Sequence, residues 1–276
     1  MPRTRRRPNP LHMRRVEPGG PFVLPPQECT SRRKEWFQRA NRILATYITL
    51  LGYAAEGHKA IAHAAKVRGI DLDTPMRFKI DDRTFQSNYR IFLGAFSKSA
   101  GQLTNQVFTL AYGNLEAYLI DVLADALTTD GAADPVQESI SLITGTRWEG
   151  KFNRIVQRWG VRLGKADIAE AYRGIRLEFF GVQSTDPLAF LQAMADLRHR
   201  LVHSAGRADA KLLAAYPQSH MKEGDLIQVP AVSPIDLQLF FVPLTEAIDR
   251  AFAEKYGWQR ILEAPEKLVD TDLRTL

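Results

Sequence analysis

Apolar residues recur three or four positions apart through most of this chain of 276 residues, and this spacing is what most constrains its fold. A repeat close to 3.6 residues is typical of an amphipathic α-helix, whereas a half-buried strand alternates at every second residue. The sequence therefore predicts an all-α protein, a helical bundle with an additional long helix on its N-terminal side. The first long repeat runs from Ser31 to about Arg68 and consists of Trp36, Ile43, Tyr47, Leu50, Leu51 and Ala54.

A second long helix is expected from Arg83 to Asp130, with a weaker pattern around residues 97–101. Residues 70–81 are expected to form a loop, and 225–229 is the only strand-like run, expected to act as a clip or arm. The expected division is a Pro/Arg-rich tail (1–30), an N-terminal helical extension (31–80), the bundle (83–257) and a C-terminal tail (258–276). Within the bundle, further helices are expected over residues 135–143, 148–159, 166–178, 187–205, 208–216 and 233–257.

The net charge of +6 arises from one end of the chain. Six arginines and no acidic residue lie in residues 1–15, and the other 31 basic residues balance the 31 acidic ones. Prolines in this segment forbid a continuous helix. We expect a disordered basic tail that aids solubility, or alternatively an arm that follows phosphates by charge alone.

No run of about 18 apolar residues is present, so the sequence predicts no membrane span. The first residues also lack the apolar core of a signal peptide. The single cysteine, Cys29, excludes an internal disulfide and fits a reducing compartment. The expected location is the cytoplasm.

The segment Arg198-His199-Arg200-Leu201-Val202-His203 carries the candidate chemistry. It ends a helix that Asp186 and Pro187 are expected to begin and Gly206 to close. On a helical wheel, Arg198 falls inside the apolar stripe, while His199 and His203 fall at its border with the polar side.

A guanidinium in an apolar stripe needs a partner, because it cannot shed its charge and burying it unpaired costs several kcal/mol. The plainest partner is an acid on another helix, for example Asp121 or Glu116. Alternatively, the side chain snorkels out to solvent or faces a site where an anion binds, since the guanidinium fork matches the oxygens of a phosphate.

Histidine exchanges protons near neutral pH, so Arg198 and His203 together suit RNA cleavage. RNA supplies its own nucleophile, the 2′-hydroxyl, and needs a base and a cation beside the phosphate. The two residues lie five positions apart, about 140° around a helix. Either the helix loosens near Gly206, or two copies of the chain share one cleft, as in a symmetric dimer.

His199 and His203 also have the i,i+4 spacing of a metal-binding pair, although no third ligand is apparent. His58 and His63 are expected to be surface or packing residues, and His12 and His220 to have no site role. No metal or cofactor is therefore expected.

The string "ADLRHRLVHSAGRADAKLL" resembles the Arg-x(4–6)-His motif of HEPN domains, in particular the bacterial RiboL-PSP-HEPN type. The segments "NLEAYLIDVLADAL", "RWEGKFNRIVQRWG" and "EGDLIQV" are similar to that type in order and spacing. The resemblance covers about residues 83–257. The chain departs from the family pattern at His199, where Asn is frequent, and at Ser204-Ala205, which replace Asn-Gly.

The resemblance implies a bundle that dimerises through the motif helices and acts as a metal-independent endoribonuclease. Such proteins serve in toxin–antitoxin or anti-phage defence systems, so the expected partners are RNA, a second copy and an antitoxin or defence protein. Arg198 would position the phosphate, His203 would be the acid/base, His199 a polar helper and Glu116 an orienting acid. Arg200, Ser204 and Arg207 are expected to contact RNA.

Two alternatives stay open at this point. Some HEPN proteins only bind RNA or partners, and the chain would then be a non-catalytic helical module that uses its arginine tail and first helix. In the other, the bundle is purely structural, and Arg198 is enclosed by carboxylates away from solvent.

Overall fold

The computed structural model of the chain describes residues 27–80, 82–179, 182–204, 206–216, 221–230 and 233–263. The chain is mostly helical, as the sequence predicts. Its elements are β1 (Gln27–Cys29), α1 (Ser31–Val67), β2 (Pro75–Ile80), β3 (Arg83–Asn88), α2 (Tyr89–Thr129), α3 (Pro135–Ile143), α4 (Trp148–Trp159), α5 (Lys165–Ala171), β4 (Leu177–Phe179), β5 (Val182–Ser184), α6 (Pro187–His203), α7 (Ala210–Ala215), α8 (Ser233–Tyr256) and β6 (Ile261–Glu263).

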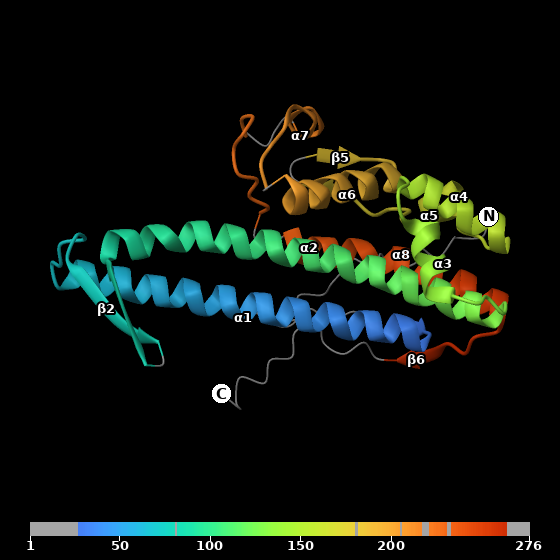
Figure 1. Cartoon of the computed structure of the whole chain (residues 1–276), viewed down its shortest axis with the longest axis horizontal. Coiled ribbons are helices and arrows are strands. Elements are labelled where there is room, and N and C mark those ends of the chain that lie inside the picture. Colours follow the sequence, from blue (N-terminus) through green and yellow to red (C-terminus); the bar gives the residue numbers. More distant parts are fainter. Residues whose placement is uncertain are drawn as a thin grey trace, which may run out of the picture.

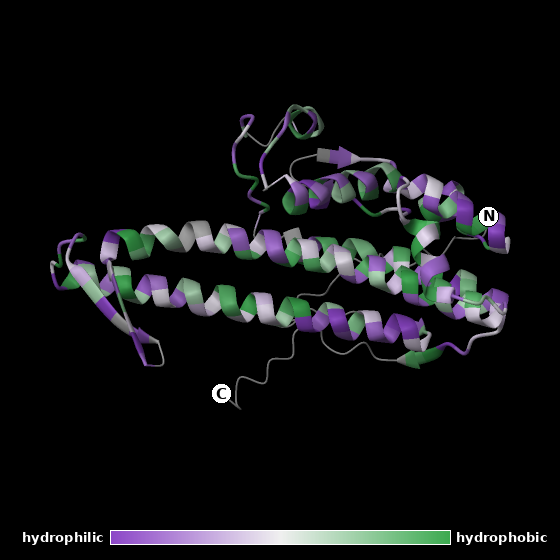
Figure 2. Cartoon of the chain, in the orientation of Figure 1, coloured by the Kyte–Doolittle hydropathy of each residue, from purple (hydrophilic) through white to green (hydrophobic). Residues whose placement is uncertain are grey.

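Two long antiparallel helices, α1 and α2, lie side by side and form the spine of the molecule (Figure 1). Their outer parts, with the antiparallel β2–β3 hairpin that joins them, extend beyond the other helices; we name residues 50–102 the arm. Figure 2 shows apolar residues interspersed with polar ones along the helices of the arm. Large apolar side chains are exposed there, namely Leu50, Tyr53, Val67, Leu72, Phe85 and Ile91.

The inner half of α2 is the centre of the core. It contacts α1, α3, α6 and α8, and one continuous apolar cluster joins all of them. Trp36 and Leu44 of α1 belong to the same cluster, so the start of α1 packs as part of the bundle. Of the described helices, α2 alone is long and apolar enough to cross a membrane. Within its most apolar stretch of 18 residues, however, 61% is buried inside the fold, as in the core helix of a globular protein.

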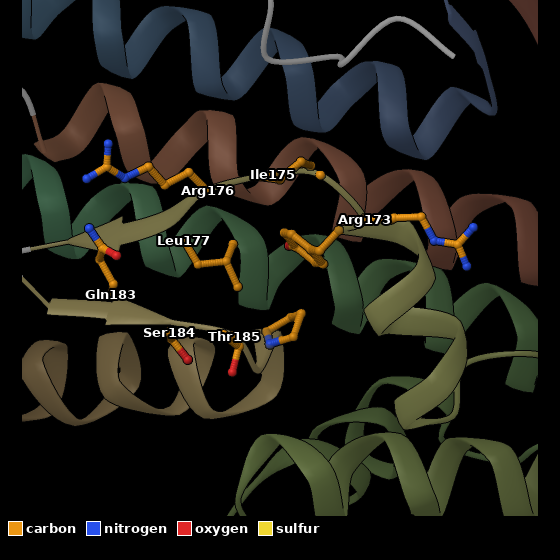
Figure 3. Close-up of a pocket in the computed structure, with 10 residues that line it drawn as sticks. Arg173, Ile175, Arg176, Leu177, Gln183, Ser184 and Thr185 are labelled. Carbon is orange, nitrogen blue, oxygen red and sulfur yellow. The ribbon is translucent and has the colours of Figure 1, made fainter. Parts of the chain in front are cut away.

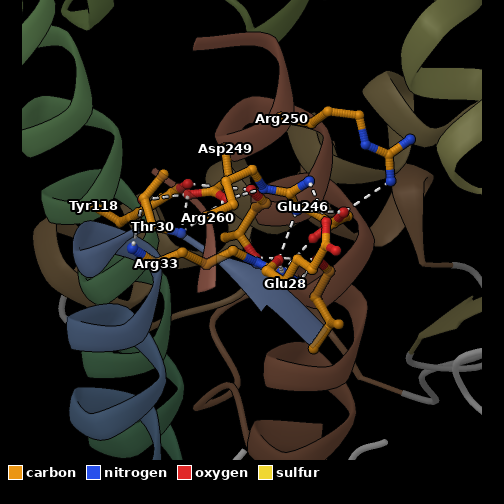
Figure 4. A network of polar contacts seen from close by, with 10 residues as sticks. Glu28, Thr30, Arg33, Tyr118, Glu246, Asp249, Arg250 and Arg260 are labelled. Carbon is orange, nitrogen blue, oxygen red and sulfur yellow. Dashed lines mark hydrogen bonds and ion pairs between the residues drawn. The ribbon is translucent and has the colours of Figure 1, made fainter. Parts of the chain in front are cut away.

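The two ends of the described chain are joined by strands β1 and β6, which pair antiparallel. Beside them lies a network of buried charges (Figure 4). Asp249 accepts hydrogen bonds from the backbone and hydroxyl of Thr30 and from Arg260 Nε at 3.0 Å. Arg33, which is fully buried, pairs with Glu246, and Arg260 donates to the same carboxylate at 2.8 Å. The network ties the first turn of α1 to the last turns of α8.

Several helix boundaries were predicted well. The expected helices 135–143 and 148–159 match α3 and α4, and Asp130-Gly131 ends α2 as expected. Gly69 follows the last turn of α1 with φ +60°, the left-handed conformation that glycine adopts at a helix end. The pattern that weakens at residues 97–101 does not interrupt α2.

Other expectations were wrong. The second helix begins at Tyr89, because Arg83–Asn88 pairs with Pro75–Ile80 in a hairpin where a loop and a helix were expected. The helix expected over 166–178 ends at Ala171 and is followed by the β4–β5 hairpin. The run 225–229 forms no strand: Leu226 makes a single bridge with Arg207. The basic segment of residues 1–26 lies outside the described residues.

We expect Asp249→Ala to lower the free energy of unfolding by about 3 kcal/mol, because it leaves the buried Thr30 N–H and Arg260 without their acceptor. Glu254→Ala is the matched control, since Glu254 is an exposed carboxylate on the same helix; it should change stability by less than about 0.5 kcal/mol. Urea denaturation measures both. Equal small effects would mean that the network contributes nothing to the fold.

Candidate functional site

Helix α6 is regular over the whole candidate motif. Asp186 caps it by accepting from the N–H groups of Leu188 and Ala189, and Pro187 is its first residue, as predicted. The helix continues through His203, and Ser204 N–H still donates to Arg200 O at 3.0 Å. Gly206, with φ +66°, follows its end. The helix therefore does not loosen before His203, so the structure excludes the first of the two arrangements expected to unite Arg198 with His203.

Arg198 lies beside the buried apolar face of α6 and reaches toward α2. Its Nη2 is 3.7 Å from Glu116 Oε2, which is an ion pair longer than a hydrogen bond. Its Nε is buried and has no hydrogen-bond partner among the described residues. The side chain keeps 31% of its surface exposed. Of the two acids expected as partners, the structure pairs Glu116 with Arg198, whereas Asp121 pairs with Arg39.

Lys151 of α4 is a second cation on the same carboxylate. Its Nζ is 3.9 Å from Glu116 Oε1 and 4.4 Å from the ring centre of Trp148. Only 9% of the side chain is exposed. Burial lowers the pKa of Lys151 below its ordinary value; Glu116 opposes this shift and Arg198 adds to it.

Lys151 was not predicted as a site residue, although its position in the sequence carries a signal for one. It lies three positions after Trp148, next to the stripe of buried residues formed by Trp148, Phe152, Ile155 and Trp159. A cation beside an apolar stripe is the same feature that drew attention to Arg198.

Aromatic and amide groups fix this cluster in place. Trp148 Nε1–H donates to the hydroxyl of Tyr112, one turn before Glu116 on α2. Gln192 of α6 accepts from the first N–H of α4 at 3.2 Å and donates to Asp196 at 2.8 Å. Burial, followed by the charge of Glu116, raises the pKa of Tyr112 well above its usual range, so the phenol stays protonated. Helices α2, α4 and α6 are thus joined by polar contacts around Glu116.

The arrangement carries an excess of positive charge. Two cations share one carboxylate, and neither contact has hydrogen-bond length. A guanidinium offers five N–H donors, and here the described protein groups satisfy few of them. An anion with several oxygens, such as a phosphate, complements this cluster through charge-assisted hydrogen bonds.

His199 and His203 lie on the exposed side of α6. Their ring centres are 4.6 Å apart. Among the described residues, no hydrogen bond or ion pair joins either imidazole to Arg198. One protomer therefore presents the cation cluster and the imidazoles on different sides of the helix.

The three residues expected to contact RNA differ in their surroundings. Arg200 is held by Asp209, with Nε 2.9 Å from Oδ1, and only 13% of its side chain is exposed. Arg207 is exposed and donates to Gly224 O at 2.7 Å, and Ser204 is an exposed C-cap. Arg200 thus holds α7 against α6, while Ser204 and Arg207 remain accessible.

Two of the other histidines, His58 and His63, lie on the arm, away from the motif. His63 is exposed and His58 half-buried, while His12 and His220 lie outside the described residues. Within the described ranges, no group of three His, Cys, Asp or Glu side chains is placed to share a metal ion.

A cavity of about 310 Å³ lies beside the β4–β5 hairpin, between α5 and the start of α6 (Figure 3). It is lined by Arg173, Arg176, Gln183, Ser184 and Thr185, among others. Arg173 pairs with Glu170, and Arg176 pairs with Glu178. None of the candidate site residues lines this cavity, so it is separate from the charged cluster.

No family model, curated protein or solved structure matches the chain. The likeness to HEPN domains is therefore carried by the motif and helix order alone.

Glu116→Gln should lower the free energy of unfolding by about 1–3 kcal/mol at pH 7, because it leaves Lys151 nearly buried without its counter-charge. The loss should shrink as pH rises toward the ordinary lysine pKa of 10.5, because the lowered pKa of Lys151 makes its amine largely neutral in both folded proteins by then. It should also be smaller in a Lys151→Met background. Urea denaturation of the wild type, the two single variants and the double variant tests this coupling between Glu116 and Lys151. Strictly additive changes in the free energy of unfolding would contradict it.

Proposed function

We propose that the protein is a metal-independent endoribonuclease of the HEPN type that acts as a homodimer. The observation that carries the proposal is the partly exposed cluster of Arg198 and Lys151 on the single carboxylate of Glu116. It offers a phosphate a net positive, preorganised site, and His203 follows on the same helix. The setting that the HEPN resemblance implies is a cytoplasmic toxin–antitoxin or anti-phage system, with an antitoxin or defence protein as partner.

In the proposed reaction, His203 accepts the proton of the 2′-hydroxyl, and the 2′-oxygen attacks the adjacent phosphorus. The bond from phosphorus to the 5′-oxygen breaks, and that oxygen takes a proton, leaving a 2′,3′-cyclic phosphate and a 5′-hydroxyl. Arg198 stabilises the charge on the non-bridging oxygens. Glu116 orients Arg198 through their ion pair, and His199 assists as a polar neighbour of His203.

Lys151 joins this set as a residue for phosphate binding. Burial lowers the pKa of Lys151, whereas Glu116, and equally a bound phosphate, would favour the ammonium form. Its position above Trp148 keeps the amine directed at the cluster. Ser204 at the end of α6 and Arg207 beyond it are exposed, which supports a role for both in contacting the RNA.

A non-catalytic module that binds RNA or protein is the second candidate. The observation that favours it is the arm, which extends beyond the bundle with exposed apolar side chains such as Tyr53 and Ile91. Exposed apolar groups gathered on one part of a protein are typical of interaction surfaces. In this second candidate function, the protein binds RNA or a partner protein, and His199 and His203 are not needed for binding.

His203→Ala should reduce RNA cleavage by about 10²–10⁴-fold, because it removes the proton acceptor while leaving the exposed end of α6 folded. His63→Ala, a change of an exposed histidine on the arm, is the control and should cleave as the wild type does. Cleavage of a labelled RNA measures both, with circular dichroism to check folding. Full activity of His203→Ala would remove the assignment, and binding without cleavage by the wild type would favour the second candidate.

Mixing Arg198→Ala with His203→Ala tests the shared cleft. If each active site takes Arg198 from one copy and His203 from the other, a mixed dimer keeps one intact site of its two. Random mixing of two inactive proteins should then restore about a quarter of wild-type cleavage. A mixture that stays inactive, although subunit exchange is verified by a tag on one variant, would argue against sites built from two protomers.

A further inference from the structure

The imidazoles of His199 and His203 form an exposed pair on one side of α6. Their ring centres are 4.6 Å apart and their planes are inclined at 44°. Both residues are exposed, and among the described residues no hydrogen bond or ion pair occupies their ring nitrogens. Each ring therefore has a nitrogen lone pair open to a ligand from solution.

The helix holds this pair in a fixed relation. Side chains at positions i and i+4 of an α-helix point the same way, about 5–6 Å apart at Cβ. The opposite face of α6 is anchored by Phe190, Leu191, Met194 and Leu197, all buried. The pair is thus carried by a rigid element, so that little ordering is needed before a ligand binds to both rings.

The spacing fits two-point binding of a transition metal. Imidazole nitrogen binds Zn²⁺ at about 2.0–2.1 Å with a near-tetrahedral angle, which places the centres of two chelating rings roughly 5 Å apart. The observed separation is close to that value. Imidazole suits Zn²⁺, Cu²⁺ and Ni²⁺, whereas Mg²⁺ and Ca²⁺ prefer oxygen.

The neighbouring cations do not occupy the pair. Arg198 is turned toward Glu116 of α2, and Arg200 is held by Asp209, so neither guanidinium occupies the ring nitrogens of the imidazoles. Since no third protein ligand lies within the described residues, water fills the remaining positions. A site of this kind exchanges its metal and suits a regulator better than a permanent structural ion.

We propose that His199 and His203 chelate a divalent transition metal and that this metal inhibits the enzyme. The inhibitory part rests on the proposed ribonuclease function. A metal bound to the ring nitrogen of His203 takes up the lone pair that would accept the 2′-hydroxyl proton. His203, which would let the reaction proceed without a metal, would thus be the residue through which a bound metal inhibits it.

Binding is measured first, by isothermal titration calorimetry of ZnCl₂ and NiCl₂ into the full chain. The wild type should bind with an affinity at least about tenfold above that of His199→Gln, which keeps one imidazole and loses the chelate. His63→Gln is the matched control, because it removes another exposed histidine that has no partner at i+4. Equal affinity of the wild type and His199→Gln, or an equal loss in His63→Gln, would overturn the site.

Inhibition is measured second, as the ratio of RNA cleavage with and without Zn²⁺ for each protein. At a Zn²⁺ concentration about ten times the wild-type dissociation constant, this ratio should fall about tenfold for the wild type and His63→Gln, and no more than about twofold for His199→Gln, whose affinity is at least about tenfold lower. Similar ratios in all three proteins would overturn the regulatory role.

The metal-binding measurement and the cleavage measurement can fail independently of each other. If the wild type binds Zn²⁺ through the pair but cleaves no RNA, the proposed function is wrong and the metal site stands. If RNA is cleaved but the pair binds no metal, the metal site is wrong and the nuclease stands.

Discussion

The burial of the inner half of α2 on nearly every side is the constraint from which the rest of the structure follows. Phe108, Leu115, Leu119 and Leu123 are all fully buried, because α1, α3, α6 and α8 cover the helix. The acids beside this buried face are only partly exposed, and Glu116, Asp121 and Asp125 each have a counter-charge on a neighbouring helix. The acids of α2 therefore decide where the surrounding helices place their cations.

These acids are satisfied in two different ways. Asp125 and Asp121 are each paired with one arginine of α1, at 2.6 and 2.9 Å, and these contacts fasten α1 to α2. Glu116 instead lies between Arg198 and Lys151, with neither contact shorter than 3.7 Å. A close pair leaves little unmatched charge, and Arg32 is shared further with Glu35, whereas a loose pair of cations on one acid leaves positive charge for something else. This contrast distinguishes the candidate site from the structural ion pairs on the same helix.

Local sequence signals predicted the helices and part of the site. An aspartate followed by a proline begins both α3 and α6, and such signals act within a few residues, so they can be read from the sequence. The β2–β3 hairpin was missed because Phe85 and Tyr89 have the same four-residue spacing in a strand followed by a helix as in one helix. The pairing of Arg33 with Glu246, across 213 positions, depends on how α1 and α8 meet and leaves no local trace. Lys151 was missed although its position beside an apolar stripe was visible.

The regularity of α6 connects the proposed chemistry with the proposed assembly. Because the helix stays hydrogen-bonded through His203, Arg198 points toward α2 while the imidazoles point away from it. If a phosphate is held by Arg198 and Lys151, as proposed, its imidazole would come from a second α6 related by a two-fold axis. The same outward position leaves His199 and His203 open to a metal in a single copy of the chain. The proposed dimer and the proposed metal site would therefore make opposite demands on one face of one helix.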